Sequence, residues 1–182
     1  MMGVLIRWAD DLIGLLGGAS GPNRRVDWSE VASKLGTDVP ADFKRFSEVD
    51  GPGEIQGGIV VTSPTSVVPA LDFVQYSLGT SEDFRRYGRE LAEKEFPYLF
   101  HPEPGGLIGW GYSGEGSFFW KSVGEPDGWT VVAMEVRGPG WFEFDGGMAE
   151  FLVKLIQREL VVDFLFEDGD DRLGPSFRGL HS

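Results

Sequence analysis

Hydrophobic residues along the chain follow two spacings, one typical of helices and one typical of strands. Residues 3–16 repeat apolar side chains every three or four positions, which places them on one helix face, and Gly17 ends the repeat. A second stripe over residues 28–35 follows Asp27 and Glu30, which form a variant of the capping box, and stops at Gly36. The sequence therefore predicts two helices near the N-terminus.

Residues 35–64 contain the pattern around which we expect the rest of the fold to be organised. Pro40 suits the first position of a helix, where its missing N–H costs nothing. The apolar stripe of this helix consists of Phe43, Phe46 and Val49. Gly51 ends it, the glycines of residues 53–58 allow sharp turns, and the β-branched residues 59–62 form a strand.

The remaining elements are punctuated by glycine and proline. Residues 80–83 open a helix that Pro97 ends, and residues 146–160 form the last strong amphipathic helix. Residues 161–166 are apolar enough to dock as more helix or as an edge strand, whereas residues 172–182 lack an apolar repeat and predict a loosely ordered tail. The predicted strands are residues 59–62, 107–112, 117–121, 130–136 and 141–144.

These elements predict an α+β fold in one domain over residues 1–182. Short gaps between the strands favour hairpins, so we expect a twisted, mainly antiparallel sheet of about five or six strands. N-terminal, middle and C-terminal helices pack on that sheet. The predicted core spans about residues 28–160, with the N-terminal helix at residues 3–16 and an acidic C-terminal tail at residues 161–182.

Two blocks of the sequence resemble the SUKH superfamily (SMI1/KNR4-like). The first lies in residues 35–64 and reads Leu-Gly, X-Pro, Asp-Phe-Lys-X-Phe, Gly-X-Gly-X-Ile, then the strand and Pro64. The second, residues 107–155, contains Ile-Gly-Trp-Gly, Phe-Phe-Trp, Pro-Asp-Gly-Trp-Thr-Val-Val and the Phe-Leu pair that opens the last helix. The resemblance implies the same α+β arrangement. It also implies a bacterial immunity protein that neutralises a secreted toxin, or, as in the eukaryotic branch, an intracellular scaffold or regulatory interaction module.

Charge and composition narrow the class of partner. The chain carries 29 acidic and 16 basic residues, a net charge of −13, so phosphate backbones are repelled and direct nucleic-acid binding is not expected. Such a surface suits a basic protein partner, although acidity can also serve solubility alone. The absence of cysteine excludes disulfides and thiol chemistry. Without a secretory signal at residues 1–11, or an apolar run near the roughly 18 residues of a membrane span, we expect a cytoplasmic protein.

No motif indicates an enzyme, a cofactor or a metal. Residues 109–114 match G-x-G-x-x-G, but a strand follows where a dinucleotide site needs a helix, so a hairpin turn is predicted. His101 and His181, the two histidines, are predicted to lie in a surface loop and in the tail. The acids of residues 167–171 lack the frame of a calcium loop. Most of the six tryptophans are expected in the core, with one or two left to anchor a partner.

The hypothesis that follows is a non-enzymatic protein that occludes a basic, nuclease-type active site with carboxylates. Residues 141–171 form the densest acidic region, with nine acidic and two basic residues. Acids in the predicted hairpin turns and in the glycine-rich corner complete the surface. The predicted partner-binding residues are Glu54, Glu115, Glu125, Asp127, Glu167, Asp168, Asp170 and Asp171.

Overall fold

Five α-helices and seven strands make up the described part of the computed structural model, which comprises residues 1–18, 23–55, 58–90, 97–138, 140–165 and 176–180. The helices are α1 (Met2–Leu15), α2 (Trp28–Leu35), α3 (Ala41–Val49), α4 (Phe73–Glu90) and α5 (Met148–Ile156), with a short 3-10 turn, η1 (Pro126–Gly128). The strands are β1 (Gly53–Ile55), β2 (Ile59–Val61), β3 (Leu107–Tyr112), β4 (Gly116–Lys121), β5 (Thr130–Glu135), β6 (Trp141–Phe144) and β7 (Phe177–Gly179).

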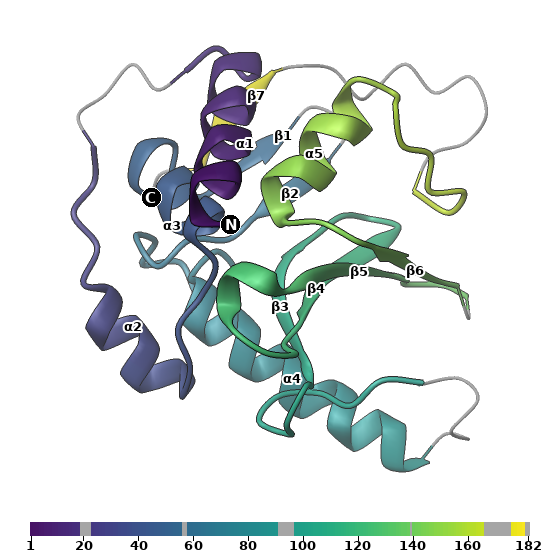
Figure 1. Ribbon diagram of the computed structural model, residues 1–182. Helices are drawn as coiled ribbons and strands as arrows, with labels where there is room; N and C mark the ends of the chain where they lie inside the picture. The colour runs from purple at the N-terminus through teal and green to yellow at the C-terminus, as the bar shows by residue number, and fades with distance from the viewer. Residues whose placement is uncertain (19–22, 56–57, 91–96, 139, 166–175, 181–182) are drawn as a thin grey trace.

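The strands form one antiparallel sheet in the order β6-β5-β4-β3-β2-β1-β7. Figure 1 shows α1, α3 and α5 on one side of this sheet and α4 on the other, with α2 at the side of the molecule. The α+β class and the antiparallel sheet predicted from the sequence are therefore confirmed. Both faces are covered in the middle of the sheet, which explains why β4 reads as an almost continuous apolar run.

Alternate residues of β4 enter two separate clusters. Phe118 and Trp120 point into the larger cluster beneath α1, α3 and α5, whereas Phe119 joins a smaller cluster with Phe100 on the face that α4 crosses. Trp110 is fully buried in the larger cluster. Trp120 and Trp129 are buried there as well, so half of the six tryptophans lie in the core and Trp8, Trp28 and Trp141 are half-buried.

In the first half of the chain, the residues predicted to begin and end helices, and to face the core, do so in the structure. The Asp27 carboxylate accepts the backbone N–H of Glu30 at 3.0 Å, which caps α2, and Gly36 ends that helix in the left-handed conformation with φ 84°. Gly51, with φ 73°, turns the chain after α3. The predicted stripe of α3 faces the core, and its members Phe43, Phe46 and Val49 are all buried.

The sheet has two more strands than the five identified in the sequence, which corrects the expected count of about five or six. Gly53 lies inside β1 rather than in a turn, because β1 pairs with both β2 and β7. A Cβ atom at Gly53 would overlap the ring of Phe177. Glycine is therefore required by close packing here, not by backbone flexibility. The expectation of a loosely ordered tail is wrong for residues 176–180, since β7 lies there.

Three other boundaries differ from the sequence prediction. α4 begins at Phe73, well before residues 80–83, because the Asp72 carboxylate accepts the N–H of Gln75 at 2.7 Å and caps the helix there. α5 is shorter than residues 146–160 and ends at Ile156. Residues 161–165 form neither helix nor edge strand but a coil and turn, and Val162 and Leu165 are buried.

The glycines of residues 109–114 serve close packing and not a phosphate site. Gly109 lies beneath α4, where a Cβ atom would come within 3.1 Å of Tyr76, and a Cβ atom on Gly111 would lie 2.6 Å from the carbonyl oxygen of Val60. A bulge at Trp110 separates the two glycines, and β3 runs directly into a turn and β4. The predicted hairpin is confirmed.

Asp42 joins α3 to α5 from a fully buried position. One carboxylate oxygen accepts the N–H of Phe43 at 2.8 Å, and the other accepts the N–H of Ala149, in the first turn of α5, at 2.9 Å. Burial raises the pKa of Asp42 to about 6, and these N–H groups limit the rise because they stabilise the carboxylate. Asp42 is thus a cap for α5 supplied by another helix.

The raised pKa predicts how stability depends on pH. A folded-state pKa of about 6 lies above the unfolded value near 3.9, so the group adds stability that is fully present below pH ~4 and is lost as pH rises through 6. Relative to Asp42→Asn, which cannot titrate, the wild-type free energy of unfolding should fall by about 2 kcal/mol between roughly pH 4.5 and pH 7. Urea denaturation across this range measures the difference. A difference that stays constant or grows with pH would contradict it.

Candidate functional site

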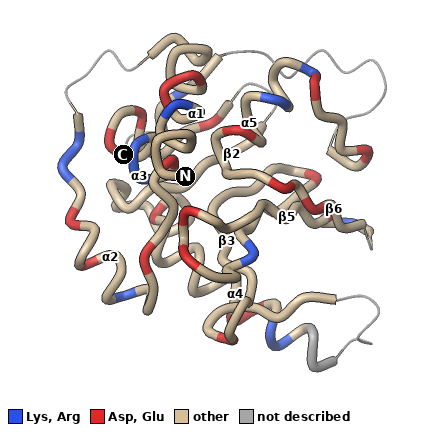
Figure 2. The backbone as a smooth tube through the Cα atoms, viewed as in Figure 1, with Lys and Arg blue, Asp and Glu red and all other residues tan. Residues whose placement is uncertain are grey.

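The sequence-predicted acids are distributed over several parts of the sheet. Glu115 lies in the turn before β4 and Glu125 lies after β4, so the two sit at opposite ends of a six-residue strand, on the order of 20 Å apart. Asp127 accepts the backbone N–H of Ala41 at 2.9 Å and thereby fixes the start of α3. Figure 2 shows acidic positions spread over helices, strands and connections rather than gathered on one face.

Two further groups of predicted acids occupy different places. Glu54 on β1 forms an ion pair with Arg178 on β7, so its charge is matched by a neighbouring strand. The acids Glu167, Asp168, Asp170 and Asp171 lie outside the described residues. The structure therefore brings together none of Glu54, Glu115 and Glu125, and it assigns a structural contact to Asp127 and to Glu54.

A groove beside β6 is lined by two carboxylates, and we call it the β6 groove. Its volume is about 490 Å³, and it lies between the start of β6 and residues 162–164. The lining residues are Glu135, Gly140, Trp141, Phe142, Val162, Asp163 and Phe164. Carboxylates and aromatic rings thus share one open site, and none of its described lining residues is a cation.

Glycines and buried anchors shape the β6 groove. A Cβ atom on Gly116 would lie 2.6 Å from Leu165, and one on Gly140 would lie 3.1 Å from Phe164, so glycine at both positions lets residues 162–165 approach the strand ends. Burial of Val162 and Leu165 holds this segment in place. Asp163, between the anchors, remains exposed to solvent.

The carboxylates around the β6 groove have no ion pair among the described residues, as is also true of exposed acids elsewhere, such as Glu82, Glu103 and Glu125. Glu135 accepts the N–H of Gly140 at 3.1 Å and has no ion pair among the described residues. Within the same described part of the chain, Asp163, Asp145 and Glu115 also have no cationic partner. Glu115 adjoins this region because its carbonyl accepts the N–H of Val136, at the end of β5, at 2.9 Å. Ion pairs neutralise Asp10, Asp11, Glu30, Asp38, Glu54, Asp83, Glu143 and Glu150.

Glu143 on β6 belongs to a polar cluster on the face opposite α5. Its carboxylate accepts the hydroxyl of Tyr98 at 2.6 Å and the ammonium of Lys121 at 3.1 Å. These two contacts lower the pKa of Glu143, whereas burial and the adjacent carboxylate raise the pKa of Tyr98. Tyr98 also packs against Trp141, with ring centroids 4.9 Å apart. The cluster fixes the outer face of β6.

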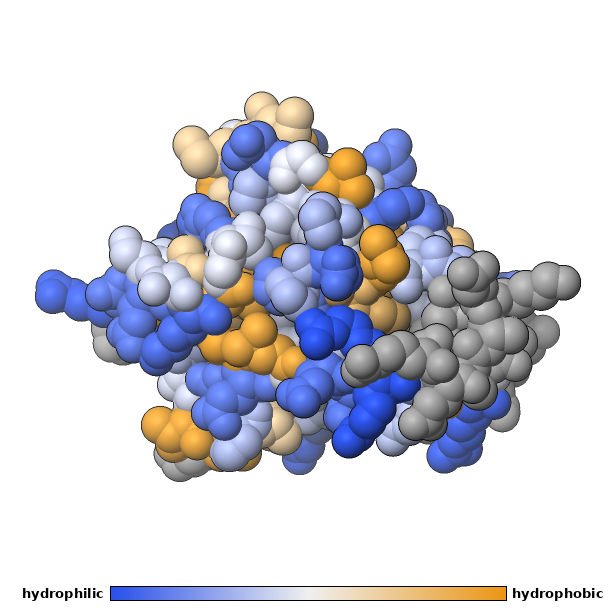
Figure 3. All heavy atoms as spheres, turned by 90° about the horizontal axis from the view of Figure 1, so that it is seen from below, coloured by the Kyte–Doolittle hydropathy of each residue, from blue (hydrophilic) through white to orange (hydrophobic). Residues whose placement is uncertain are grey.

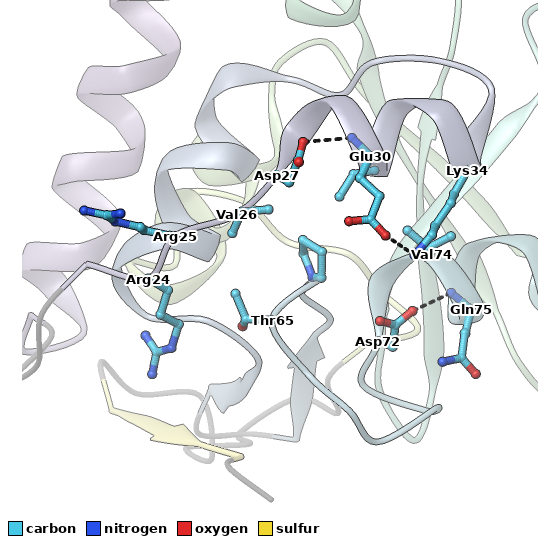
Figure 4. A pocket seen from close by; sticks show the side chains of 12 residues that line it. Arg24, Arg25, Val26, Asp27, Glu30, Lys34, Thr65, Asp72, Val74 and Gln75 are labelled. Carbon is cyan, nitrogen blue, oxygen red and sulfur yellow. Dashed lines mark hydrogen bonds and ion pairs between the residues drawn. The ribbon is translucent and has the colours of Figure 1, made fainter.

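A second groove, of about 570 Å³, lies between α2, residues 24–27 and the segment that leads into α4. Figure 4 shows Arg24 and Arg25 on one side of it and Lys34, Asp72 and Gln75 on the other. Its three cations are matched by three acids, namely Asp27, Glu30 and Asp72. Because Glu30 pairs with Lys34 and the two aspartates cap helices, this groove has no net preference for either sign of charge.

His101 makes a structural contact with the end of α2. His101 is half-buried, which corrects the expected surface position, and its Nε2 lies 2.7 Å from the carbonyl oxygen of Leu35, the last residue of α2. This contact satisfies a carbonyl that the helix itself leaves unpaired. His181 lies outside the described residues.

Apolar exposure does not identify a large docking patch on the face crossed by α4. Leu78, Tyr87 and Leu99 are exposed there and in the connection that follows α4. Figure 3, which views the molecule from below, shows hydrophobic side chains as separate spots among hydrophilic ones. Scattered apolar residues of this kind are normal on a protein surface.

Among the described residues, no three His, Cys, Asp or Glu side chains cluster in a way that could hold a metal ion. None of the described helices combines the length and the apolar character that crossing a bilayer requires. Comparison with protein-family models, curated proteins and solved structures finds no match for the chain.

Proposed function

We propose that the protein is a non-enzymatic immunity protein that binds a basic, nuclease-type toxin and occludes its active site. Two lines of reasoning support the proposal: the order of the two motif blocks that resemble the SUKH superfamily, and the net charge of −13. The observation that carries it is the group of carboxylates without an ion pair, Glu115, Glu135 and Asp163, at the end of the sheet where the β6 groove lies.

Occlusion demands charge complementarity and no chemistry. A nuclease site attracts phosphate and is therefore basic, so carboxylates held on a rigid sheet can take the place of phosphates. Exposed ion pairs contribute little to such attraction, because their charges already cancel at short range. The unpaired acids near the β6 groove leave a field that can steer a basic partner into contact.

Association should therefore depend strongly on salt. With the toxin identified by co-purification from the native host, raising salt from about 50 mM to 300 mM should slow association at least about tenfold, with a smaller change in dissociation. The triple variant Glu115→Gln, Asp145→Asn, Asp163→Asn should reduce the association rate about threefold or more at low salt. Stopped-flow or surface-based kinetics measure both rates.

A charge-matched control separates a local site from net charge. The variant Asp10→Asn, Asp38→Asn, Asp83→Asn removes three acids that are already ion-paired elsewhere, and it should slow association less. A third variant, with Glu167, Asp168, Asp170 and Asp171 changed to amides, tests the acids predicted from the sequence. Salt-insensitive association, or equal effects of the first two variants, would reject the acidic surface.

Gene order distinguishes immunity from the scaffold alternative. An immunity protein is expected beside a gene for a large secreted protein with a variable C-terminal toxin domain. A scaffold or regulatory module carries no such expectation. Protection of a host that expresses that neighbouring toxin would support the proposal, whereas killing that this protein leaves unchanged would contradict it.

A further inference from the structure

β6 is an edge strand of the sheet, and the structure indicates which of its backbone groups face outward. The N–H of Glu135 donates to the carbonyl of Gly140 at 2.8 Å, so these opposite residues form a hydrogen-bonded pair. Hydrogen-bonded and non-hydrogen-bonded pairs alternate in an antiparallel ladder. In the observed register, Phe142 and Phe144 therefore bond to β5, whereas Glu143 directs its N–H and C=O away from the sheet.

The outward-facing backbone groups of Glu143 lie one residue along β6 from Phe142, which lines the β6 groove. No backbone partner for the N–H or C=O of Glu143 occurs within the described ranges. The β6 groove runs along the first half of the same strand, with Phe142 and Phe164 as apolar contacts and Glu135 and Asp163 as carboxylates. Unpaired backbone groups of an edge strand beside a side-chain pocket are the features that bind an extended peptide as an added strand.

We propose that β6 and the β6 groove bind an extended, basic segment of the partner protein by strand addition. Glu143 supplies the backbone donor and acceptor, and Asp163, Asp145 and Glu135 select lysine or arginine at alternate positions of the added strand. The proposal rests on the proposed function for the identity of the partner, but its chemistry is independent of what that partner does.

A second copy of the chain fits this edge poorly. An antiparallel pair of β6 strands centred on Glu143 would place the two Glu143 side chains, each with its Lys121, opposite each other, and Asp145 opposite Trp141. Like charges directly across a strand pair are destabilising, and each chain already carries a net charge of −13. The same acids also discourage a neutral or acidic strand. Charge therefore selects a basic segment.

A defined probe tests strand addition without the natural partner. The probe is the acetylated and amidated peptide Lys-Val-Lys-Val-Lys-Val, with the Glu-Val counterpart as charge control and an alternately N-methylated Lys-Val peptide as backbone control. We expect saturable binding of the first peptide, and at least about tenfold weaker binding of each control, which corresponds to loss of a few charge or hydrogen-bond contacts.

The structural signature of strand addition is protection of one amide. The N–H of Glu143 points to solvent, so its hydrogen exchange should slow at least about tenfold when the Lys-Val peptide saturates the protein. The N–H of Phe144 already bonds to β5 and should change little. Two-dimensional NMR resolves both amides in the full-length protein.

Matched substitutions at one position separate the backbone from the side chain. Glu143→Pro removes the carboxylate and the outward N–H and leaves the β5–β6 bonds in place, whereas Glu143→Val removes the carboxylate and keeps the N–H. We expect the proline variant to bind the Lys-Val peptide about tenfold more weakly than the valine variant. If Glu143→Pro does not fold, the N-methylated peptide and Glu143 exchange give the same test.

The following outcomes would contradict the binding of a basic segment to β6 by strand addition. No binding at roughly millimolar peptide, equal binding of the charge control, or binding without protection of Glu143 would each do so. Self-association that Glu143→Pro abolishes would assign the edge to a second copy. If the toxin binds Glu143→Pro as tightly as Glu143→Val, strand addition is wrong while the proposed function stands. If the peptide results hold but no basic toxin is found, the proposed function alone is wrong.

Discussion

Phe43→Ala is expected to lower the free energy of unfolding by about 3–5 kcal/mol, because it empties a fully buried site where several aromatic rings meet. The Phe43 ring centroid lies 4.7 Å from that of Phe73 at the start of α4 and 5.1 Å from that of Trp120 on β4. It also lies 6.2 Å from the Trp28 ring on α2. One side chain thus joins three helices to the sheet, and its neighbours cannot all move to fill the space.

The measurement is equilibrium denaturation of the variant beside two controls. Phe43→Leu keeps most of the volume and should lose less than half as much stability as Phe43→Ala. Tyr87→Ala removes an aromatic ring of similar size from a half-exposed position on α4 and should cost about 1 kcal/mol or less. Equal stabilities of Phe43→Ala and the wild type would show that the apolar stripe of α3 does not pack in the core.

Elements that depend on neighbouring residues could be predicted from the sequence. Asp27 and Gly36 bound α2 as expected, since a cap and a left-handed glycine act within one turn of the helix. The start of α4 was missed, although Asp72 caps it through Gln75 in the same way. Proline and glycine in residues 64–79 interrupt the apolar spacing, so the sequence predicted the start of this helix only at residues 80–83.

Features that depend on distant partners could not be predicted. Gly53 looks like a turn residue until the ring of Phe177, more than a hundred positions later, is placed over it. β7 is three residues long and has no alternating pattern, so its pairing with β1 alone makes it a strand.

The candidate site also combines features that depend on neighbouring residues with features that depend on distant ones. Acidity and the turn position of Glu115 were visible in the sequence, but its neighbour Glu135 was not singled out. The β6 groove joins residues 135–142 to residues 162–164, and no sequence spacing reveals that contact. The open edge of β6 follows from strand order, which only the assembled sheet defines. The apolar residues Val162 and Leu165 were the one signal that this segment docks.

Removal of residues 176–182 is expected to cost about 2–4 kcal/mol of stability, in place of the small loss that a loosely ordered tail implied. The truncation deletes β7 and its ladder with β1, and it uncovers Phe46, whose ring centroid lies 5.7 Å from that of Phe177. It also removes the bond from the N–H of Leu180 to the carbonyl of Pro52. β1, three residues long, then becomes an exposed edge.

A mutant cycle shows whether this loss comes from packing of Phe177 on Gly53. Gly53→Val places a side chain where the ring lies, and Phe177→Ala removes the ring, so each should destabilise the fold by about 2 kcal/mol or more. Once the ring is absent, valine meets no obstacle, so the double variant should be more stable than the sum of the two losses predicts. Thermal and urea unfolding of the four proteins measure this coupling. Strict additivity, or truncation without loss of stability, would mean that β7 does not pack on β1 in solution.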